Sequence, residues 1–286
     1  MNILLLDNGY IAWHCRYAIK DFSYNEIKSG LIFHYLINIL KLAKRFRTNK
    51  FVFAFDSSKS FRKEIYPNYK NRPSNEEDEV LNKLCKQQVL ELRKYILPEI
   101  GFKNIFYVNG MESDDIVADL VCQNNNEYIV IGRDHDYYQL LDKCSMWDFK
   151  NKKERNESWL LEEKGVNACQ YLDASCLAGC STDTVEGINR VGESTAIKYI
   201  LGTLGKHTKA YKDIESENGK EIIERNRKLI QLPFNNLNLK LDFDEKFNKL
   251  RFVELMNEYE MYSIVRDDLN DWAQYRDWET DRKAHV

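Results

Sequence analysis

Acidic side chains recur at four points of the sequence, and three of these points directly follow a short apolar run. The runs NILLLD, KFVFAFD and EYIVIGRDHD each resemble a buried strand that ends in carboxylates: Asp7, Asp56, and Asp134 with Asp136. The fourth group, Glu112, Asp114 and Asp115, opens a helical pattern. Parallel strands of an open α/β sheet bring their carboxyl ends to one rim, so we expect these acids to converge. Such carboxylates repel one another unless cations lie among them, which indicates a site for Mg²⁺ or Mn²⁺.

One aspartate after a strand is often only the cap of the next helix. Three such strands and a Glu-Ser-Asp-Asp cluster make coincidence a poor explanation. A pair of divalent ions held about 4 Å apart activates a water and stabilises the leaving oxygen of a phosphodiester. The acids therefore favour phosphodiester hydrolysis.

A basic segment with interleaved aromatic residues follows Asp56 immediately. Its members are Lys59, Arg62, Lys63, Lys70 and Arg72, with Phe61, Tyr66 and Tyr69 between them. Cations beside aromatic rings suit a nucleic-acid backbone with stacked bases. A solvated charged loop is the alternative, but a metal centre that cleaves phosphodiesters needs cations close by to hold the phosphate.

The stretch GINRVGESTA, residues 187–196, is predicted to form a tight turn between helices. Gly187 and Gly192 leave backbone N–H groups accessible, and such groups at a helix N-terminus bind phosphate oxygens. An ordinary helix-turn-helix corner would have the same spacing. No lysine follows Gly192, which excludes a nucleotide-binding P-loop.

Strand and helix patterns alternate along the first half of the chain, as in a parallel sheet. The strand patterns cover 2–6, 51–55, 105–108 and 128–132, and the helical ones about 27–47, 77–97 and 113–123. We predict an α/β fold with a mostly parallel central sheet flanked by helices, followed by a helical region. The expected domains are 1–165, 166–270 and a polar tail at 271–286 that need not be native.

Composition narrows the class of protein. The 286 residues include 42 basic and 45 acidic side chains, a net charge of −3, so the net charge does not indicate a nucleic-acid partner. The 7 cysteines include no Cys-x-x-Cys pair and are expected to be reduced thiols. With no signal peptide and no apolar stretch long enough for a bilayer, we expect a soluble cytoplasmic protein of a bacterial or phage-infected cell, with no membrane partner.

Five motifs, in order, carry a resemblance over residues 2–235: LLLDNGYIAWHCRYA, FAFDSSKSFRKEIYPNYKNRP, ESDDIVADLV, IGRDHDYYQLL and GCSTDTVEGINRVGESTA. This order resembles the 5′-nuclease family of flap endonucleases, 5′-exonuclease domains of bacterial DNA polymerase I and phage 5′-exonucleases. The resemblance implies a PIN-like core, a helical arch at about 66–97 for a single-stranded 5′ end, and a helix-hairpin-helix at about 185–201.

The resemblance also implies roles for individual residues. The metal-binding acids would be Asp7, Asp56, Glu112, Asp114, Asp115, Asp134, Asp136 and Asp183. Catalytic cations would be Lys70, Arg62 and Arg72. DNA would contact Lys59, Lys63, Tyr69, Gly187, Arg190, Gly192, Ser194 and Thr195, with K⁺ at the helix-hairpin-helix.

Three positions depart from the family pattern. Cys180 follows Gly179 where the family has aspartate, and a thiol is a poor Mg²⁺ ligand, so we expect weakened second-metal binding. The family's Tyr-Lys-x-x-Arg is shortened to Tyr69-Lys70-Asn71-Arg72, which shifts Arg72 by one residue. His14 stands where the family has arginine, and a packed histidine is the expected reading.

The predicted function is that of a metal-dependent 5′-3′ exonuclease or 5′-flap endonuclease in DNA replication or repair, using two Mg²⁺ or Mn²⁺ ions. Its expected partner is DNA with a 5′ single-stranded end or flap, or an RNA/DNA primer hybrid, bound by a monomer. A PIN-type ribonuclease is one alternative, although it lacks the basic segment and the glycine turn. A non-catalytic or weakly active structure-specific DNA-binding protein is the other, and Cys180 supports it.

Overall fold

A computed structural model of the protein describes residues 2–16, 23–24, 27–71, 76–123 and 126–276. The chain divides into two compact units. The first comprises Met1–Phe55, Ser74–Phe106 and Lys240–Val286, and the second Asp56–Pro73 and Tyr107–Leu239. The domain boundaries predicted at 165 and 270 remain predictions.

The first unit is built on β1 (Ile3–Asp7) and β4 (Phe51–Phe55), which pair in parallel with Leu4 opposite Phe51 and Asp7 opposite Ala54. All residues of both strands are buried, as expected for parallel strands covered on both faces. The strand order continues as β1–β4–β5, with β5 at Ile105–Tyr107. These strands lie where the sequence predicts them, within one residue at each end.

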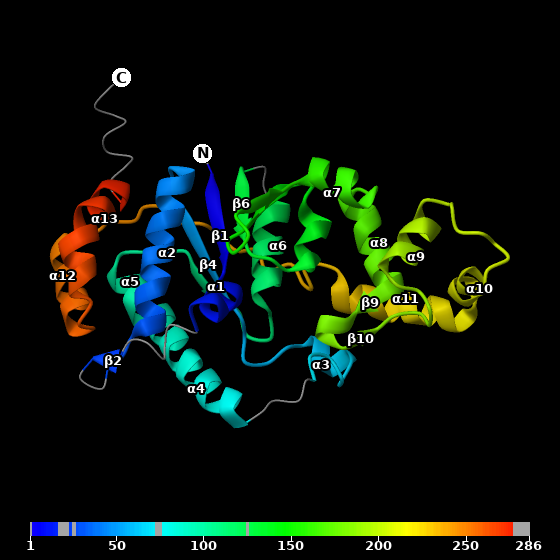
Figure 1. The fold of residues 1–286 in the computed structure, drawn as a ribbon, viewed down its shortest axis with the longest axis horizontal. Helices are drawn as coiled ribbons and strands as arrows, with labels where there is room; N and C mark the ends of the chain where they lie inside the picture. Colours follow the sequence, from blue (N-terminus) through cyan, green and yellow to red (C-terminus); the bar gives the residue numbers. More distant parts are fainter. Residues whose placement is uncertain (1, 17–22, 25–26, 72–75, 124–125, 277–286) are drawn as a thin grey trace, which may run out of the picture. The chain divides into compact units, whose positions relative to one another are not determined.

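Helices complete the first unit, and α2 lies beside α13 within it (Figure 1). They are α1 (Asn8–Cys15), α2 (Gly30–Phe46), α4 (Glu76–Glu91), the π-helix Leu92–Ile96, α5 (Leu97–Glu99), α12 (Lys249–Glu258), the π-helix Ile264–Asp268 and α13 (Leu269–Arg276). A short hairpin joins β2 (Ser23–Tyr24) to β3 (Ile27–Lys28), so the helix predicted from 27 begins three residues later. The predicted tail is helical at its start, because Trp272 is buried against Phe252.

The second unit contains β6 (Tyr128–Ile131), β7 (Cys144–Asp148) and β8 (Lys153–Arg155), with β6 and β7 parallel and β8 antiparallel. Its helices are α3 (Arg62–Ile65), α6 (Ser113–Gln123), the 3-10 helix η3 (His135–Leu140), α7 (Glu157–Lys164), α8 (Ala168–Ala178), the 3-10 helix η4 (Ser181–Asp183), α9 (Glu193–Ile200), α10 (Lys209–Glu215) and α11 (Glu217–Ile230). The predictions of a mostly parallel sheet flanked by helices and of a helix-rich region beyond residue 166 are confirmed.

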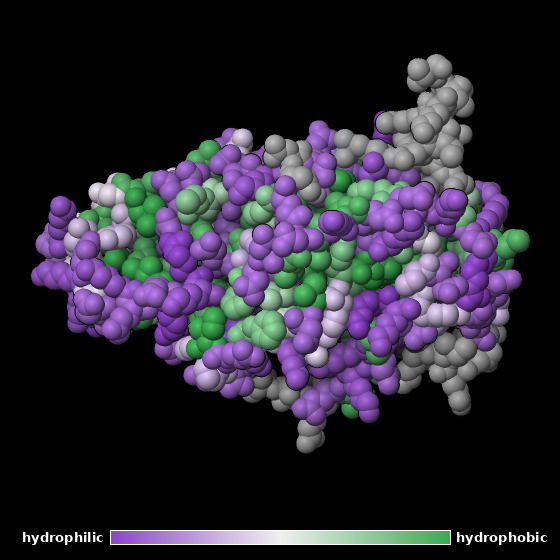
Figure 2. Space-filling view, turned by 180° about the vertical axis from the view of Figure 1, so that it is seen from behind, coloured by the Kyte–Doolittle hydropathy of each residue, from purple (hydrophilic) through white to green (hydrophobic). Residues whose placement is uncertain are grey.

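A two-strand hairpin, β9 (Gly179–Cys180) and β10 (Val185–Glu186), separates α8 from the turn that leads to α9. The apolar core behind this turn includes Leu177, Ile188 and Ala196, so both ends of the GINRVGESTA segment are anchored. Hydrophilic side chains cover most of the face seen in Figure 2, with smaller hydrophobic patches between them. Among the described helices, none is both long and apolar enough to cross a bilayer.

Candidate metal centre

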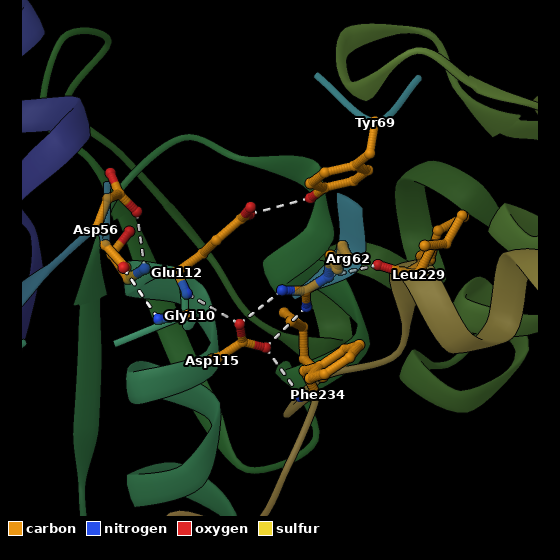
Figure 3. A network of polar contacts seen from close by, with 12 residues as sticks. Asp56, Arg62, Tyr69, Gly110, Glu112, Asp115, Leu229 and Phe234 are labelled. Carbon is orange, nitrogen blue, oxygen red and sulfur yellow. Dashed lines mark hydrogen bonds and ion pairs between the residues drawn. The ribbon is translucent and has the colours of Figure 1, made fainter. Parts of the chain in front are cut away.

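The start of α6 holds the Glu-Ser-Asp-Asp cluster in place. Asp56 directly follows β4, and its Oδ1 accepts a hydrogen bond of 2.8 Å from the backbone N–H of Ser113 (Figure 3). This bond satisfies one of the N–H groups that a helix leaves unpaired at its first turn. Asp114 and Asp115 follow in the same turn, where the helix dipole favours negative charge.

Asp115, in this first turn, forms a buried ion pair with Arg62. The Arg62 guanidinium donates to both oxygens of Asp115, at 2.6 and 2.7 Å, while its Nε donates to the carbonyl of Leu229 at 2.8 Å (Figure 3). The Asp115 oxygens also accept the backbone N–H groups of Glu112 and Phe234. Only 2% of the Arg62 surface is exposed. Arg62 was predicted to contact phosphate, but its guanidinium binds Asp115 and the carbonyl of Leu229. Both oxygens of Asp115 accept hydrogen bonds from protein donors.

Tyr69 and Lys70 bridge two of the predicted metal-binding acids. The Tyr69 hydroxyl lies 3.0 Å from Oε2 of Glu112 and 3.1 Å from Oδ2 of Asp183. The ammonium of Lys70 lies 2.6 Å from the same Glu112 oxygen and 3.8 Å from the same Asp183 oxygen. Tyr69 was predicted to contact DNA, but it is buried and its ring is not available for stacking on a base. Arg72 lies outside the described residues.

A second group gathers Asp136, Cys180 and Asp183, whose ligand atoms all lie within 4.8 Å of one another. Asp136 comes from η3, which begins shortly after β6, whereas Cys180 and Asp183 come from the β9–β10 hairpin. The exposed Asp134 accepts the backbone N–H of Asp136 at 3.0 Å and so caps η3. Three ligand-type side chains from two distant segments thus share one small region.

Two glycines make this hairpin possible. Gly179 has a φ of +71°, and a Cβ at this position would lie 2.4 Å from both the Gly187 nitrogen and the Val185 carbonyl oxygen. A Cβ on Gly187 would meet the Ala178 carbonyl oxygen at 2.1 Å. The backbone of Lys70 then donates to the Asp183 carbonyl at 2.8 Å, which joins the hairpin to the basic segment.

The charges of this region are only partly balanced. Burial, and then repulsion from Asp115, raises the pKa of Asp114 well above its usual value. Burial also raises the pKa of Asp136, with Asp134 and Asp183 adding to it. By contrast, Lys70 outweighs burial at Glu112 and lowers the pKa of that carboxyl. The Lys70 ammonium therefore does not neutralise the carboxyl groups of this region.

Two observations fit this cluster to a divalent cation. Oδ1 of Asp114 is buried and has no hydrogen-bond partner among the described residues. Such an oxygen costs free energy unless a proton or a cation satisfies it. Burial and the neighbouring Asp136 and Asp183 also raise the pKa of the Cys180 thiol to about 12, which marks strongly negative surroundings. A bound cation would satisfy the Asp114 oxygen and would lower the pKa of the Cys180 thiol.

The remaining predicted residues belong to neither of these two groups. Asp7 belongs to the first unit, where its Oδ1 accepts the backbone N–H of Tyr10 and caps α1. Lys59 and Lys63 are exposed, in the loop before α3 and in α3 itself. In the glycine turn, Arg190, Gly192 and Ser194 are exposed, while Gly187 and Thr195 are half-buried. The helix-hairpin-helix stays a prediction.

Gln139 is a supporting residue that sequence reasoning missed. Its amide nitrogen donates to the carbonyl oxygens of Asp136 and Ile230, and its amide oxygen accepts from the N–H of Leu232. It therefore ties the turn that carries Asp136 to the end of α11. A glutamine within YYQLL has no local signal for this role, because two of its three partners, Ile230 and Leu232, lie 91 and 93 residues away along the chain.

Comparison with known proteins places this chain in a family. Residues 2–167 match the family model described as 5′-3′ exonuclease, N-terminal resolvase-like domain. A protein named 5′-3′ exonuclease from Buchnera aphidicola is 28% identical over 241 residues, which span 82% of this chain and 77% of that protein. DNA polymerase I of Lactococcus lactis is 26% identical over 75% of this chain, which spans only 25% of the polymerase.

Solved structures agree on the fold. The T5 5′-exonuclease with bound zinc ions superposes with a TM-score of 0.68 and 20% identity, over 82% of this chain and 90% of that one. The catalytic core of Rad2 in complex with a DNA substrate has a TM-score of 0.52 and 16% identity, over 94% and 92% of the two chains. At these identities the likeness is one of fold. By its match to the family model over more than half its length, this chain belongs to the 5′-3′ exonuclease family.

Proposed function

We propose that this protein is a divalent-metal-dependent nuclease that hydrolyses DNA phosphodiesters near 5′ ends, as an exonuclease or at the junction of a 5′ flap. The observation that carries the proposal is the incompletely balanced carboxylate cluster of the second unit, with Lys70 bound at its edge. Family membership supports the same chemistry.

Two groups of residues would hold metal ions. One group is Asp56, Glu112 and Asp114. Asp7 remains a metal ligand predicted from the family resemblance alone. The other is Asp136 and Asp183, with Cys180 beside them, and Asp134 is added from the family resemblance. A bound Mg²⁺ or Mn²⁺ ion would lower the pKa of a water and neutralise charge that develops on the phosphate.

The chain's own side chains supply the rest of the site. Burial lowers the pKa of Lys70, but the surrounding carboxylates of Asp114, Asp183 and Glu112 outweigh burial and raise it, so the ammonium stays protonated. It can therefore donate to a phosphate oxygen as negative charge grows there. Tyr69 fixes the positions of the Glu112 and Asp183 carboxylates, and Arg62 fixes the start of α6 through Asp115.

The proposed substrate is DNA with a 5′ single-stranded end or a flap on a duplex, and RNA/DNA primer hybrids belong to the same proposal. The exposed Lys59 and Lys63 would neutralise backbone phosphates. The turn from Gly187 to Ala196 is the proposed contact with the duplex, with K⁺ as its ion. A bacteriophage T5 flap endonuclease is described in a complex with DNA and metal ions. The DNA polymerase I relatives support a role in replication or repair. That the protein acts as a monomer is part of the same proposal.

One assay tests this function. A 5′-labelled flap duplex is incubated with the parent protein, Asp134→Ala and the matched control Glu162→Ala, each with and without Mg²⁺ or Mn²⁺. Asp134 and Glu162 are both exposed, so neither replacement empties the core. We expect metal-dependent cleavage by the parent and the control, and loss of cleavage in Asp134→Ala. Equal cleavage by all three proteins would contradict the proposed site.

A non-catalytic DNA-binding protein is the second candidate, because Cys180 replaces a carboxylate that the family pattern expects. In the same assay, such a protein would bind the flap duplex without cleaving it in any metal. Cleavage gained by Cys180→Asp would then favour this second candidate.

A further inference from the structure

At one of the proposed metal positions, Cys180 offers a sulfur ligand where the family pattern has the oxygen ligand of an aspartate. Its Sγ lies with an oxygen of Asp136 and an oxygen of Asp183 in a group whose members are all within 4.8 Å of one another. A thiolate carries the same single negative charge as a carboxylate. It differs in softness, because sulfur is a poor partner for Mg²⁺ and a good one for Zn²⁺ and similar transition metals.

The position of Cys180 is held firmly by its surroundings. Cys180 pairs with Val185 across the β9–β10 ladder. The neighbouring Gly179 is packed closely against other backbone atoms, which fixes the course of the chain here. Asp183 is buried and is fixed by Tyr69 and by the backbone of Lys70. The sulfur therefore belongs to the same rigid hairpin as one of the two carboxylates.

The three ligands match the composition of a catalytic transition-metal site. Such sites take three protein ligands and leave a fourth position for water or substrate. Ligand atoms in a tetrahedral zinc site lie ~3.5 Å apart, given bonds of roughly 2.0–2.3 Å. The ligand atoms of the present group lie within 4.8 Å of one another, and small rotations of the half-buried Asp136 and Cys180 side chains would shorten these distances to that value. Two carboxylates and one thiolate carry three negative charges, which is enough to neutralise a divalent cation.

We propose that the position formed by Asp136, Cys180 and Asp183 selects a thiophilic divalent metal, such as Zn²⁺, Co²⁺ or Fe²⁺, over Mg²⁺. The inference rests on the proposed divalent-metal function and specifies the ion at one of its two positions. The other group, Asp56, Glu112 and Asp114, has only oxygen donors and keeps the preference for Mg²⁺ or Mn²⁺. The enzyme would then combine one soft and one hard metal position.

Co²⁺ absorbance gives a readout that does not depend on cleavage. A cobalt–thiolate bond produces a charge-transfer band in the near ultraviolet, which oxygen ligands do not produce. The metal-free full-length protein is titrated with Co²⁺, alongside Cys180→Ser, Cys180→Asp and the control Cys169→Ser. Cys169 is exposed on α8 and is absent from the proposed ligand set, so it controls for thiols that bind metal non-specifically.

We expect the band in the parent and in Cys169→Ser, and its loss in both Cys180 variants. Calorimetric titration of the same proteins should show Zn²⁺ affinity falling at least about tenfold in Cys180→Ser, which has lost a ligand. In Cys180→Asp, Mg²⁺ affinity should rise while Zn²⁺ affinity falls. A band that survives in Cys180→Ser, or an absent band in the parent, overturns the inference.

The flap assay separates this result from the proposed function. A parent protein that shows the band but cleaves DNA in none of the metals retains the soft position and contradicts the nuclease. A parent protein that cleaves with Mg²⁺ alone and shows no band retains the nuclease and contradicts the soft position.

Discussion

The Arg62 guanidinium and the Asp115 carboxylate make two parallel hydrogen bonds of 2.6 and 2.7 Å, with side-chain exposures of 2% and 0%. Asp115 belongs to the first turn of α6, next to Asp114 in the sequence, and Arg62 lies beside this turn (Figure 3). Two-point pairing of this kind sets orientation as well as distance. The geometry of the acid cluster therefore depends on an arginine that does not reach solvent.

Replacing Arg62 by methionine should destabilise the protein strongly. The substitution keeps much of the side-chain volume but leaves the Asp115 charge buried without its cation, which costs about 3–5 kcal/mol. Urea unfolding, followed by circular dichroism, measures the free energy of unfolding. Arg266→Met is the matched control, because Arg266 pairs with Asp267 at the surface and should change stability little. Equal effects of the two substitutions would contradict the structural role of Arg62.

Lys70→Met should slow cleavage and yet tighten metal binding. The Lys70 ammonium now partly neutralises Glu112 and Asp183, so its loss leaves more negative charge for a divalent ion. The same loss removes a donor to the phosphate and should lower the single-turnover rate roughly 100-fold or more. Calorimetry gives the metal affinity and rapid quench gives the rate. A slower rate with weaker metal binding would instead assign Lys70 to folding of the site.

Asp136→Asn should stabilise the metal-free protein at neutral pH. Burial raises the pKa of Asp136 above its ordinary 3.8, so the folded state penalises the ionised carboxyl. The penalty is absent below pH ~4, grows as the pH rises from the ordinary pKa toward the raised pKa, and stays constant above the raised pKa. We therefore expect a gain of about 1 kcal/mol at pH 7 that vanishes near pH 4. Unfolding in the presence of a chelator measures it, with the exposed Asp142→Asn as the unchanged control.

Gly179→Ala should disrupt the β9–β10 hairpin. The added Cβ would lie 2.4 Å from two backbone atoms that have no room to move, in a left-handed conformation. The expected loss is more than about 3 kcal/mol, together with loss of metal binding. Gly165→Ala separates the two causes, because Gly165 has a similar φ of +73° and open space around it. It should cost only about 1 kcal/mol. Similar losses at both glycines would mean that backbone strain, and not crowding, limits the hairpin.

Local pattern alone predicted the elements that carry the acids. The apolar runs before Asp56 and Asp134 form β4 and β6, and the Glu112 cluster opens α6, because alternation and helical spacing are properties of neighbouring residues. The family could be inferred from the order of such motifs. The short helix α3 within the basic segment, by contrast, buries Arg62, which a count of charges cannot predict.

The sequence by itself determined which ligand types this protein offers and that strand ends carry them. Only the tertiary structure decided which acids remain available for metal, because this depends on partners far along the chain. Asp115 is paired with an arginine 53 residues away, and Tyr69 contacts Asp183 across 114 residues. Likewise, Cys180 is a departure from a motif in the sequence, and folding makes it a neighbour of Asp136 and Asp183.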